Sequence, residues 1–265
     1  MENKKIVYFD TNIFSTLKKE YQSGNTNNFN KIINSKNKFS YVYSMAHIFD
    51  LQNDKTNIKE EDFEFMGQIV DSNYLYYFEQ EERFCIDHNI KITDKYKKAE
   101  NFDDMFKQMD LDYIDSVSNP FIIQHNKYIE NKKLYKEDRK NIKLFFKNNN
   151  DIKDMYMKTI TNNFYNNKNF NIFQKYLSMY LFIDIVEDKL SEKNSKLQYR
   201  NMFIDGMHSC FSMSSNYFIT NDEKLSLKST LCYVRDDGYN IYFFYTPNNT
   251  RILDLEKFIL LLENI

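Results

Sequence analysis

The first strand-like stretch of the chain ends in a carboxylate, and this feature constrains the fold more than any other. Residues 5–9 begin with a lysine and continue as an apolar and aromatic run, Asp10 follows directly, and Thr11 and Asn12 open an apolar-periodic segment. The pattern predicts a buried strand that leads at once into a helix. In an open α/β sheet the ligand crevice lies at the carboxyl ends of the strands, so we expect Asp10 to lie there. A carboxylate at such a position needs a partner, most simply a cation.

A second stretch far along the chain repeats this pattern. Residues 217–219 form a short apolar run, which is followed by Thr-Asn and then by Asp222. Just upstream, Asp205 and, three residues later, His208 lie in a segment that is expected to be helical. The chain therefore carries three aspartates in distant segments, and two of them directly follow or closely follow a predicted strand.

The order of the predicted elements favours an α/β fold with a parallel sheet. Residues 39–44 alternate as a strand, and Ser44 is expected to cap a helix that carries His47 and Asp50. Strand, helix, strand and helix at this spacing are typical of a βαβ unit. Residues 25–37 are rich in asparagine and are expected to form a loop or a frayed helix.

The middle of the chain has a different pattern. From residue 56 to residue 198 helical periodicity dominates, although residues 74–78 are too aromatic and too short to assign. After Asp222, residues 230–234 and 239–245 are strand-like, and residues 254–262 predict a closing amphipathic helix. The last quarter of the chain thus returns to the alternating pattern of the first.

The motifs together resemble those of the PIN-domain nucleases. The resemblance rests on the strand-Asp-Thr-Asn opening, on Asp205 with His208, and on the stretch Tyr-Phe-Ile-Thr-Asn-Asp-Glu-Lys-Leu that contains Asp222. It implies a central parallel sheet flanked by helices, formed by residues 1–55 and 199–265, with residues 56–198 as a mainly helical insertion packed on this core. PIN domains generally have a much shorter connection at that point, so the resemblance covers about half of the chain.

The resemblance implies a metal-dependent endoribonuclease with a cluster of aspartates. Asp10, Asp205 and Asp222 would hold Mg²⁺ or Mn²⁺, because converging carboxylates repel one another unless cations lie between them. Such a metal lowers the pKa of a bound water and neutralises charge on the phosphate. The family places a fourth carboxylate, most often Glu, on the helix after the second strand; here Asp50 is the candidate. Each aspartate could instead be an ordinary helix cap or turn residue.

Other side chains around these aspartates are expected to support the site. The backbone N–H groups of Thr11 and Asn12, and of Thr220 and Asn221, would orient a phosphate or a metal-bound water, a role that is compatible with ordinary capping. His208 is expected to pack near Asp205 and support the site. The following lysines are candidates for contacts with substrate phosphates, although each also fits a solvated surface: Lys224, Lys228, Lys136, Lys140, Lys143 and Lys147.

Composition sets limits on the cellular setting and on partners. The chain has 265 residues, a formal net charge of −2, and three cysteines without a C-x-x-C pair, which fits a reducing cytoplasm. No long apolar run predicts a membrane span. The resemblance implies RNA as the substrate. If the chain is the toxin of a toxin–antitoxin pair, its partner would be an antitoxin or another protein. Roles in RNA processing or antiviral defence, and assembly into a homo-oligomer, are left open.

Two alternative functions follow from the same residues. A haloacid-dehalogenase-like phosphatase needs a second aspartate two residues after the first as general acid, and Asn12 stands at that position, so the required acid is missing and the sequence disfavours this alternative. A catalytically degenerate PIN-like module that binds RNA or a protein remains an alternative, because the acidic balance and the Asp at position 50 both depart from what a nuclease usually shows.

Overall fold

The computed structural model of the chain describes residues 4–52, 59–99, 111–132, 150–190, 199–234, 244–245 and 249–264. The chain divides into two compact units, of which the first comprises Met1–Phe102, Met207–Ser226 and Thr246–Ile265 and the second comprises Asp103–Gly206 and Leu227–Tyr245. Residues 56–102, which we expected in the insertion, belong to the first unit.

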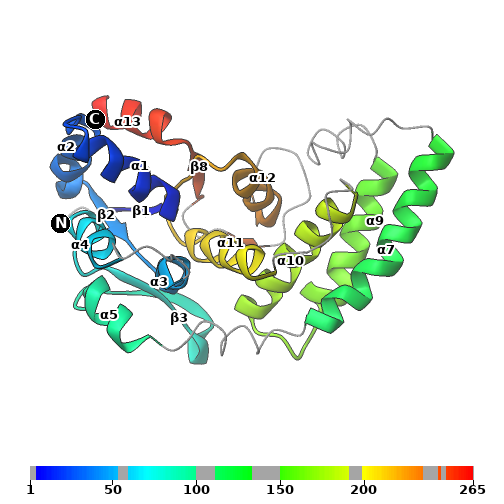
Figure 1. Cartoon of the computed structure of the whole chain (residues 1–265). Coiled ribbons are helices and arrows are strands. Elements are labelled where there is room, and N and C mark those ends of the chain that lie inside the picture. Colours follow the sequence, from blue (N-terminus) through cyan, green and yellow to red (C-terminus); the bar gives the residue numbers. More distant parts are fainter. Residues whose placement is uncertain are drawn as a thin grey trace. The chain divides into compact units, whose positions relative to one another are not determined.

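The first unit contains a four-stranded parallel sheet with the strand order β2-β1-β5-β8. Strands β1, β2 and β8 of this sheet are labelled in Figure 1. Its strands are β1 (Lys5–Phe9), β2 (Phe39–Val42), β5 (Tyr217–Ile219) and β8 (Arg251–Leu253). Val7 lies opposite Tyr41 on one side and Tyr217 on the other, which makes β1 a central strand. The predicted α/β class with a parallel sheet is confirmed. Strand β8, which lies at the edge beside β5, was not predicted.

Both faces of this sheet are buried. Side chains alternate between the two faces along each strand, so neighbouring buried residues lie on opposite faces. Val7 and Phe9 belong to the main apolar cluster, in which Phe9 packs edge-on against Phe14 and Phe258. Tyr8 points to the opposite face and is fully buried. A parallel sheet covered on both faces explains why the strands have nearly continuous apolar sequences.

Helices flank the sheet of the first unit (Figure 1). Those described in this unit are α1 (Thr11–Gln22), α2 (Asn27–Asn34), α3 (Met45–Gln52), α4 (Lys59–Val70), α5 (Ile92–Lys98) and α13 (Leu255–Glu263). Helix α2 corrects the expectation of a loop or frayed helix: Phe29 and Ile32 are buried in the main apolar cluster, and this burial stabilises a helix in an asparagine-rich segment. Helix α13 begins after Asp254, as predicted, and the Asp254 side chain accepts a hydrogen bond from the backbone N–H of Lys257.

A β-hairpin follows α4 in the first unit. Strands β3 (Tyr74–Phe78) and β4 (Arg83–Asp87) pair antiparallel, so the segment that the sequence left unassigned is a strand. The start of β3 joins the end of β2 through a parallel bridge between Tyr43 and Tyr74, in which the N–H of Leu75 donates to the carbonyl of Tyr43 at 2.7 Å. The expectation of a mainly helical region from residue 56 onward was therefore wrong for this hairpin.

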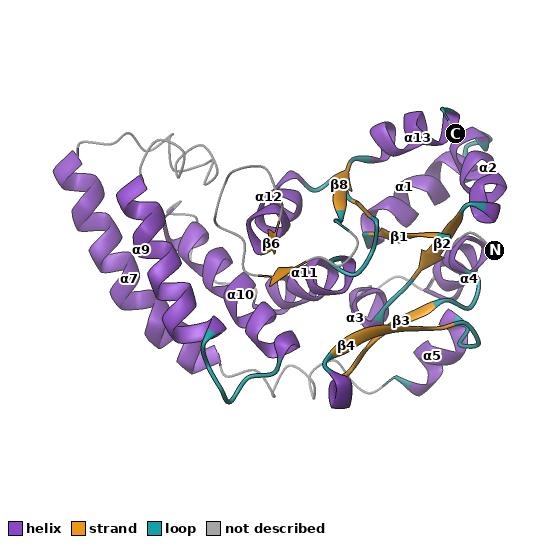
Figure 2. Cartoon of the chain, turned by 180° about the vertical axis from the view of Figure 1, so that it is seen from behind, coloured by secondary structure: helices purple, strands orange, loops and turns teal. Residues whose placement is uncertain are grey.

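The second unit is mainly helical in the part that is described (Figure 2). It contains α7 (Leu111–Lys132), α9 (Asn150–Ile160), a short π-helix (Thr161–Tyr165), α10 (Ile172–Leu190) and the short parallel pair β6 (Tyr233–Val234) and β7 (Phe244–Tyr245). The unit boundaries fall within α11 (Tyr199–Ser212) and α12 (Glu223–Cys232). The strand predicted over residues 230–234 is helical up to Cys232, and of the strand predicted over 239–245 only residues 244–245 are described.

Aromatic side chains form the core of the second unit. Phe182 on α10 packs against Phe121, Tyr156 and Phe164 with ring centroids 5.4–5.8 Å apart. Across the described ranges, no helix combines the length and the apolar character that crossing a membrane would require.

Candidate active site

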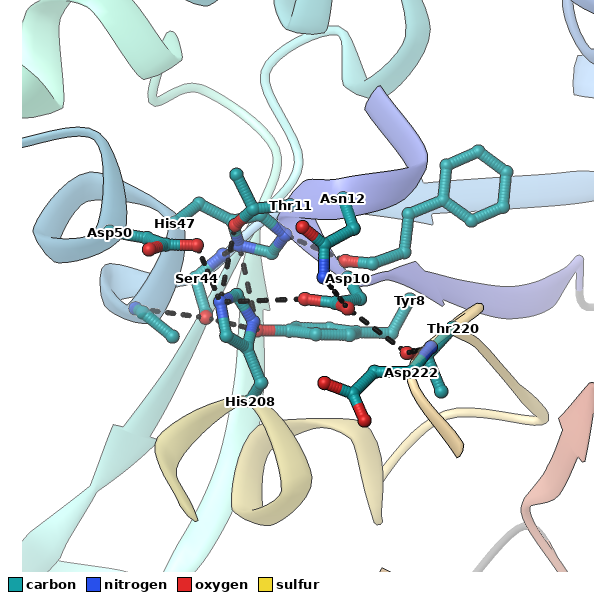
Figure 3. A network of polar contacts seen from close by, with 12 residues as sticks. Tyr8, Asp10, Thr11, Asn12, Ser44, His47, Asp50, His208, Thr220 and Asp222 are labelled. Carbon is teal, nitrogen blue, oxygen red and sulfur yellow. Dashed lines mark hydrogen bonds and ion pairs between the residues drawn. The ribbon is translucent and has the colours of Figure 1, made fainter. Parts of the chain in front are cut away.

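The strand order places a switch point between β1 and β5. The chain passes from β1 to β2 on one side of this point and from β5 to β8 on the other. In open α/β sheets, ligands bind at the carboxyl ends of the strands where the order reverses. Asp10 follows β1 directly and Thr220 follows β5 directly, so both side chains lie at this position (Figure 3).

Asp10 occupies the cap position of α1 but does not act as a cap. Its backbone is extended, yet its side chain accepts no capping hydrogen bond from the helix. Oδ2 accepts hydrogen bonds from Asn12 Nδ2 at 3.1 Å and from Thr220 Oγ1 at 3.0 Å (Figure 3). Within the described residues, Oδ1 accepts no hydrogen bond. The simple interpretation of Asp10 as a helix cap is therefore excluded.

Burial makes the Asp10 carboxylate costly to ionise. The residue is 3% exposed, and this burial raises the pKa of Asp10, although His208 and the hydrogen bonds from Thr220 and Asn12 act in the opposite direction. A cation that reached the oxygen without a hydrogen bond would stabilise the ionised form of this carboxyl group. Perturbed carboxyls in such positions are common at functional sites.

His208 on α11 lies between two carboxylates. Its Nε2 atom is 4.0 Å from Asp10 Oδ1, 3.8 Å from Asp50 Oδ2 and 3.2 Å from Thr11 Oγ1 (Figure 3). The imidazole is 1% exposed. His208 was predicted to support Asp205, whereas the structure places it against Asp10 and Asp50.

A chain of buried polar atoms fixes the orientation of the two histidines. His47 Nε2 is 2.7 Å from the carbonyl oxygen of Phe9 and therefore donates to it, while the backbone N–H of Ser44 donates to His47 Nδ1 at 3.0 Å. Tyr8 Oη contacts Ser44 Oγ at 2.7 Å and His208 Nδ1 at 2.9 Å. His47 is thus held neutral, and burial lowers its pKa to about 3.

These contacts also assign the protons on His208. When Ser44 donates its hydroxyl proton to Tyr8, and Tyr8 donates its own to His208 Nδ1, each of these protons has an acceptor. The opposite arrangement would leave the Ser44 hydroxyl proton without a described acceptor and would turn the Nε2 lone pair toward two carboxylates. In the first arrangement Nε2 of His208 carries the proton.

Asp50 has the opposite electrostatic environment to Asp10. It lies on α3 with its side chain 40% exposed. Partial burial acts to raise the pKa of Asp50, but the hydrogen bond and electrostatic attraction of His208 and the hydrogen bond of Thr11 outweigh it, so the pKa is lowered. Two neighbouring carboxyls whose pKa values are shifted apart are suited to different roles in one site.

The residues after β5 connect the site to two helices. Thr220 Oγ1 donates to Asp10 and accepts from the backbone N–H of Asp222 at 3.0 Å, so one hydroxyl links both aspartates. Asp222 Oδ1 accepts from the backbone N–H groups of Lys224 and Leu225, and it therefore caps α12. Its second oxygen has no hydrogen bond among the described residues.

Asn221 has a structural role instead of a direct one. Its Oδ1 accepts a hydrogen bond from the backbone N–H of Leu255 at 3.1 Å, which ties the end of β5 to the start of α13. The Asn221 side chain therefore stabilises the fold, and the role predicted for its backbone N–H stays a prediction. Thr11, in contrast, contributes its side chain to the site through His208 and Asp50.

The remaining predicted residues have different outcomes. Asp205 is on α11 but in the second unit. Lys228 is buried, forms an ion pair with Asp184 and lies over the Tyr180 ring, so the prediction that it contacts substrate phosphates is corrected. Lys224 is exposed and remains available. The remaining predicted lysines lie outside the described residues: Lys136, Lys140, Lys143 and Lys147.

The sequence analysis did not identify Tyr8 and Ser44 as hydrogen-bonding residues of the site. A signal existed for Tyr8, because it alternates with Val7 and Phe9 and so must face the other side of the sheet. Its contacts with residues 36 and 200 positions away along the chain carry no local signal.

The fold and the site define an α/β protein with a buried aspartate at the switch point of a parallel sheet. Among the residues that the structure describes, no group of three or more His, Cys, Asp or Glu side chains is arranged to hold a metal ion. No family model, no curated protein and no solved structure matches the chain.

Proposed function

We propose that the chain is a PIN-like, metal-dependent endoribonuclease that hydrolyses RNA phosphodiester bonds at Asp10. The observation that carries this proposal is the buried Asp10 carboxylate at the switch point, which does not cap its helix and keeps one oxygen without a hydrogen bond among the described residues. The parallel sheet and the order of the motifs are those that the resemblance implies. Whether the setting is a toxin paired with an antitoxin, RNA processing or antiviral defence stays a prediction.

The site fits a hard divalent cation. Mg²⁺ is commonly held by only one or two carboxylates and completes its shell with waters and substrate phosphates, so a larger group of protein ligands is not required. Asp10 Oδ1 and the second oxygen of Asp222 are the ligand atoms that remain for such a cation. When bound, Mg²⁺ or Mn²⁺ would lower the pKa of a water and neutralise charge on the phosphate. Asp205 stays a predicted ligand.

The other residues orient the reaction. Thr11 and Asn12 begin the 12-residue helix α1, whose backbone N–H groups point toward a phosphate placed at the crevice. Asp50 is partly exposed and has a lowered pKa, so it is ionised at neutral pH and can accept a proton from an attacking water. Asn12 and Thr220 hold Oδ2 of Asp10, which leaves Oδ1, 4.0 Å from His208 Nε2, as the oxygen that could bind a ligand.

The test is cleavage of labelled single-stranded RNA with Mn²⁺, Mg²⁺ or EDTA, in the wild type and in Asp10→Asn. We expect metal-dependent cleavage that Asp10→Asn and Asp222→Asn abolish. Asp254→Asn is the matched control, because it makes the same chemical change at the cap of α13, where asparagine also caps. Full activity in both Asp10→Asn and Asp222→Asn would refute the assignment.

A second candidate is a catalytically degenerate PIN-like module that binds RNA or a protein partner. Two observations favour it: the described residues contain no group of three metal-binding side chains, and Asp50 is already paired with His208. Titration calorimetry with Mn²⁺ separates the two candidates, because a degenerate site would bind Mn²⁺ weakly while RNA binding persisted without cleavage.

A further inference from the structure

Strand β4 lies beside β3 in the hairpin of the first unit (Figure 2), and among the described residues no strand pairs with its other side. The N–H of Leu75 on β3 donates to the carbonyl of Tyr43, so it points away from β4. Hydrogen-bonded and non-hydrogen-bonded pairs alternate along an antiparallel ladder, so Ile86, which lies opposite Leu75, directs its N–H and C=O groups away from β3. The same holds for Phe84, two residues earlier. In the part of the chain that is described, the N–H groups of Phe84 and Ile86 donate no backbone hydrogen bond across this open edge.

The open edge of β4 is held in place and lacks the usual protection. The Phe84 ring packs against Tyr77 at 5.4 Å and against Phe211 at 5.8 Å between centroids, which fixes the hairpin on its own unit. Natural edge strands are generally protected by proline, by lysine, by a bulge or by being very short. Strand β4 has five residues, pairs with β3 without a bulge, and contains neither proline nor lysine. Such an edge can accept a further strand through its backbone groups.

The sequence of β4 is complementary to itself when two copies run antiparallel. The strand reads Arg83, Phe84, Cys85, Ile86 and Asp87. A two-fold axis at Cys85 places Arg83 of each copy opposite Asp87 of the other, and Phe84 opposite Ile86. Phe84 and Ile86 are the two residues with backbone groups at the open edge, so each of these pairs can exchange two backbone hydrogen bonds. An axis at Phe84 or at Ile86 would instead leave both Arg83–Asp87 pairs unformed, so the charges select the register centred on Cys85.

We propose that two copies of this chain associate through β4, with Cys85 of one copy opposite Cys85 of the other, and form one antiparallel sheet across the two hairpins. Both charged side chains keep groups for the second copy. Arg83 contacts Glu81 of its own chain through Nε, which leaves its other guanidinium N–H groups, and Asp87 accepts from the N–H of Asn89 through Oδ1, which leaves Oδ2. This inference goes beyond the proposed nuclease and does not depend on it.

The first test measures the mass of the full chain by light scattering after size-exclusion chromatography. Between about 5 and 500 µM we expect the mass to rise from one chain to two, with a Kd of about 10–100 µM, because a small interface is weak. A chain that stays monomeric up to about 500 µM would overturn the inference. A protein partner that adds its own strand at β4 would leave the isolated chain monomeric and therefore counts against a second copy.

The second test uses Cys85 to report the register. The backbone groups of Cys85 face β3, so the two copies of Cys85 would form a non-hydrogen-bonded pair with Cα atoms about 4.5 Å apart, a distance that a disulfide spans. Oxidation with diamide should therefore join two chains, and Cys85→Ser should prevent this. Cys210→Ser is the matched control and should leave the cross-link unchanged, because Cys210 is buried. A dimer that forms no Cys85 cross-link uses another surface and would contradict the proposal.

The third test exchanges the charges. In a homodimer, Arg83→Asp would place acidic side chains opposite one another and Asp87→Arg would place basic side chains opposite one another, so each variant alone should dimerise at least about tenfold more weakly. In a mixture, one chain is acidic at both positions and the other is basic at both, so a heterodimer should form with about the Kd of the wild type. Glu81→Gln is the control: it removes the intrachain partner of Arg83 and should change the Kd by less than about twofold.

The variants decide between this interface and any other. If Arg83→Asp dimerises as well as the wild type, or if the two folded variants do not associate when mixed, β4 is not the interface. Asp87→Arg also removes the hydrogen bond to Asn89, so far-UV circular dichroism checks its fold. If this variant is unfolded, the Kd of Arg83→Asp and the cross-link through Cys85 still decide.

Discussion

Replacing Tyr8 by Phe tests whether the buried polar chain stabilises the fold. The change removes only the hydroxyl, which contacts Ser44 Oγ at 2.7 Å and His208 Nδ1 at 2.9 Å in a fully buried position. Both partners are then left without this hydrogen bond, and each buried group left unpaired costs about 1–3 kcal/mol. We expect the free energy of unfolding to fall by about 2–6 kcal/mol, all of it from the lost hydrogen bonds because the aromatic packing is kept.

The matched control is Tyr41→Phe on the neighbouring strand. The Tyr41 hydroxyl has one hydrogen bond, to Ser35 Oγ, and Ser35 still donates to the carbonyl of Ile32 after the change. We expect this variant to lose about 0.5–1.5 kcal/mol. Urea unfolding followed by circular dichroism gives both values, provided that the slope with denaturant is unchanged. If Tyr8→Phe costs no more than Tyr41→Phe, the argument that the chain fixes His208 is refuted.

Three further predictions concern charges. Burial lowers the pKa of His47 to about 3 from 6.5, so below pH 6.5 the unfolded chain takes up a proton that the folded chain does not. The free energy of unfolding should therefore fall as the pH is lowered below 6.5, by up to about 1.4 kcal/mol per pH unit. NMR should show no titration of His47 above pH 4, and His47→Gln should reduce the pH dependence of stability. Burial raises the pKa of Asp10, so above the ordinary pKa of 3.8 the unfolded chain releases a proton more readily than the folded chain, and stability should fall as the pH rises. In urea titrations at neutral pH, Asp10→Asn should therefore be more stable than the wild type. A loss of stability in this variant would contradict the reasoning. Lys228→Met alone should lose about 3–5 kcal/mol by leaving Asp184 buried without its ion pair, whereas Lys228→Met with Asp184→Leu should recover most of this in the same unfolding assay.

The sequence predicted the parts of the fold that depend on local patterns. The continuous apolar run before Asp10 and the shorter one before Thr220 identified two central strands, because a sheet covered on both faces demands such runs. The helix over residues 27–34 could not be read from its asparagine-rich sequence, since its stability comes from burying Phe29 and Ile32. Strand β8 has only three residues, too few for a periodic signal.

The candidate site was predictable only in part, for a related reason. Asp10 was identifiable because an aspartate at the end of a buried strand conflicts with its surroundings. The role of His208 was not, because it depends on Tyr8 and Asp50, which come from β1 and α3 while His208 comes from α11. Of the two roles considered for Asp222, a helix cap or a member of the site, the structure shows the cap, which uses Oδ1.

The pairing of β1 with β5 has a consequence for synthesis. The hydrogen bond from Thr220 to Asp10 joins residues 210 positions apart, so it cannot form until most of the chain has left the ribosome. At typical elongation rates this delay is roughly 10–40 s after Asp10 is made. Until then Asp10, His208 and Asp222 are not assembled, so the growing chain carries only separate parts of the candidate site while it is attached to the ribosome.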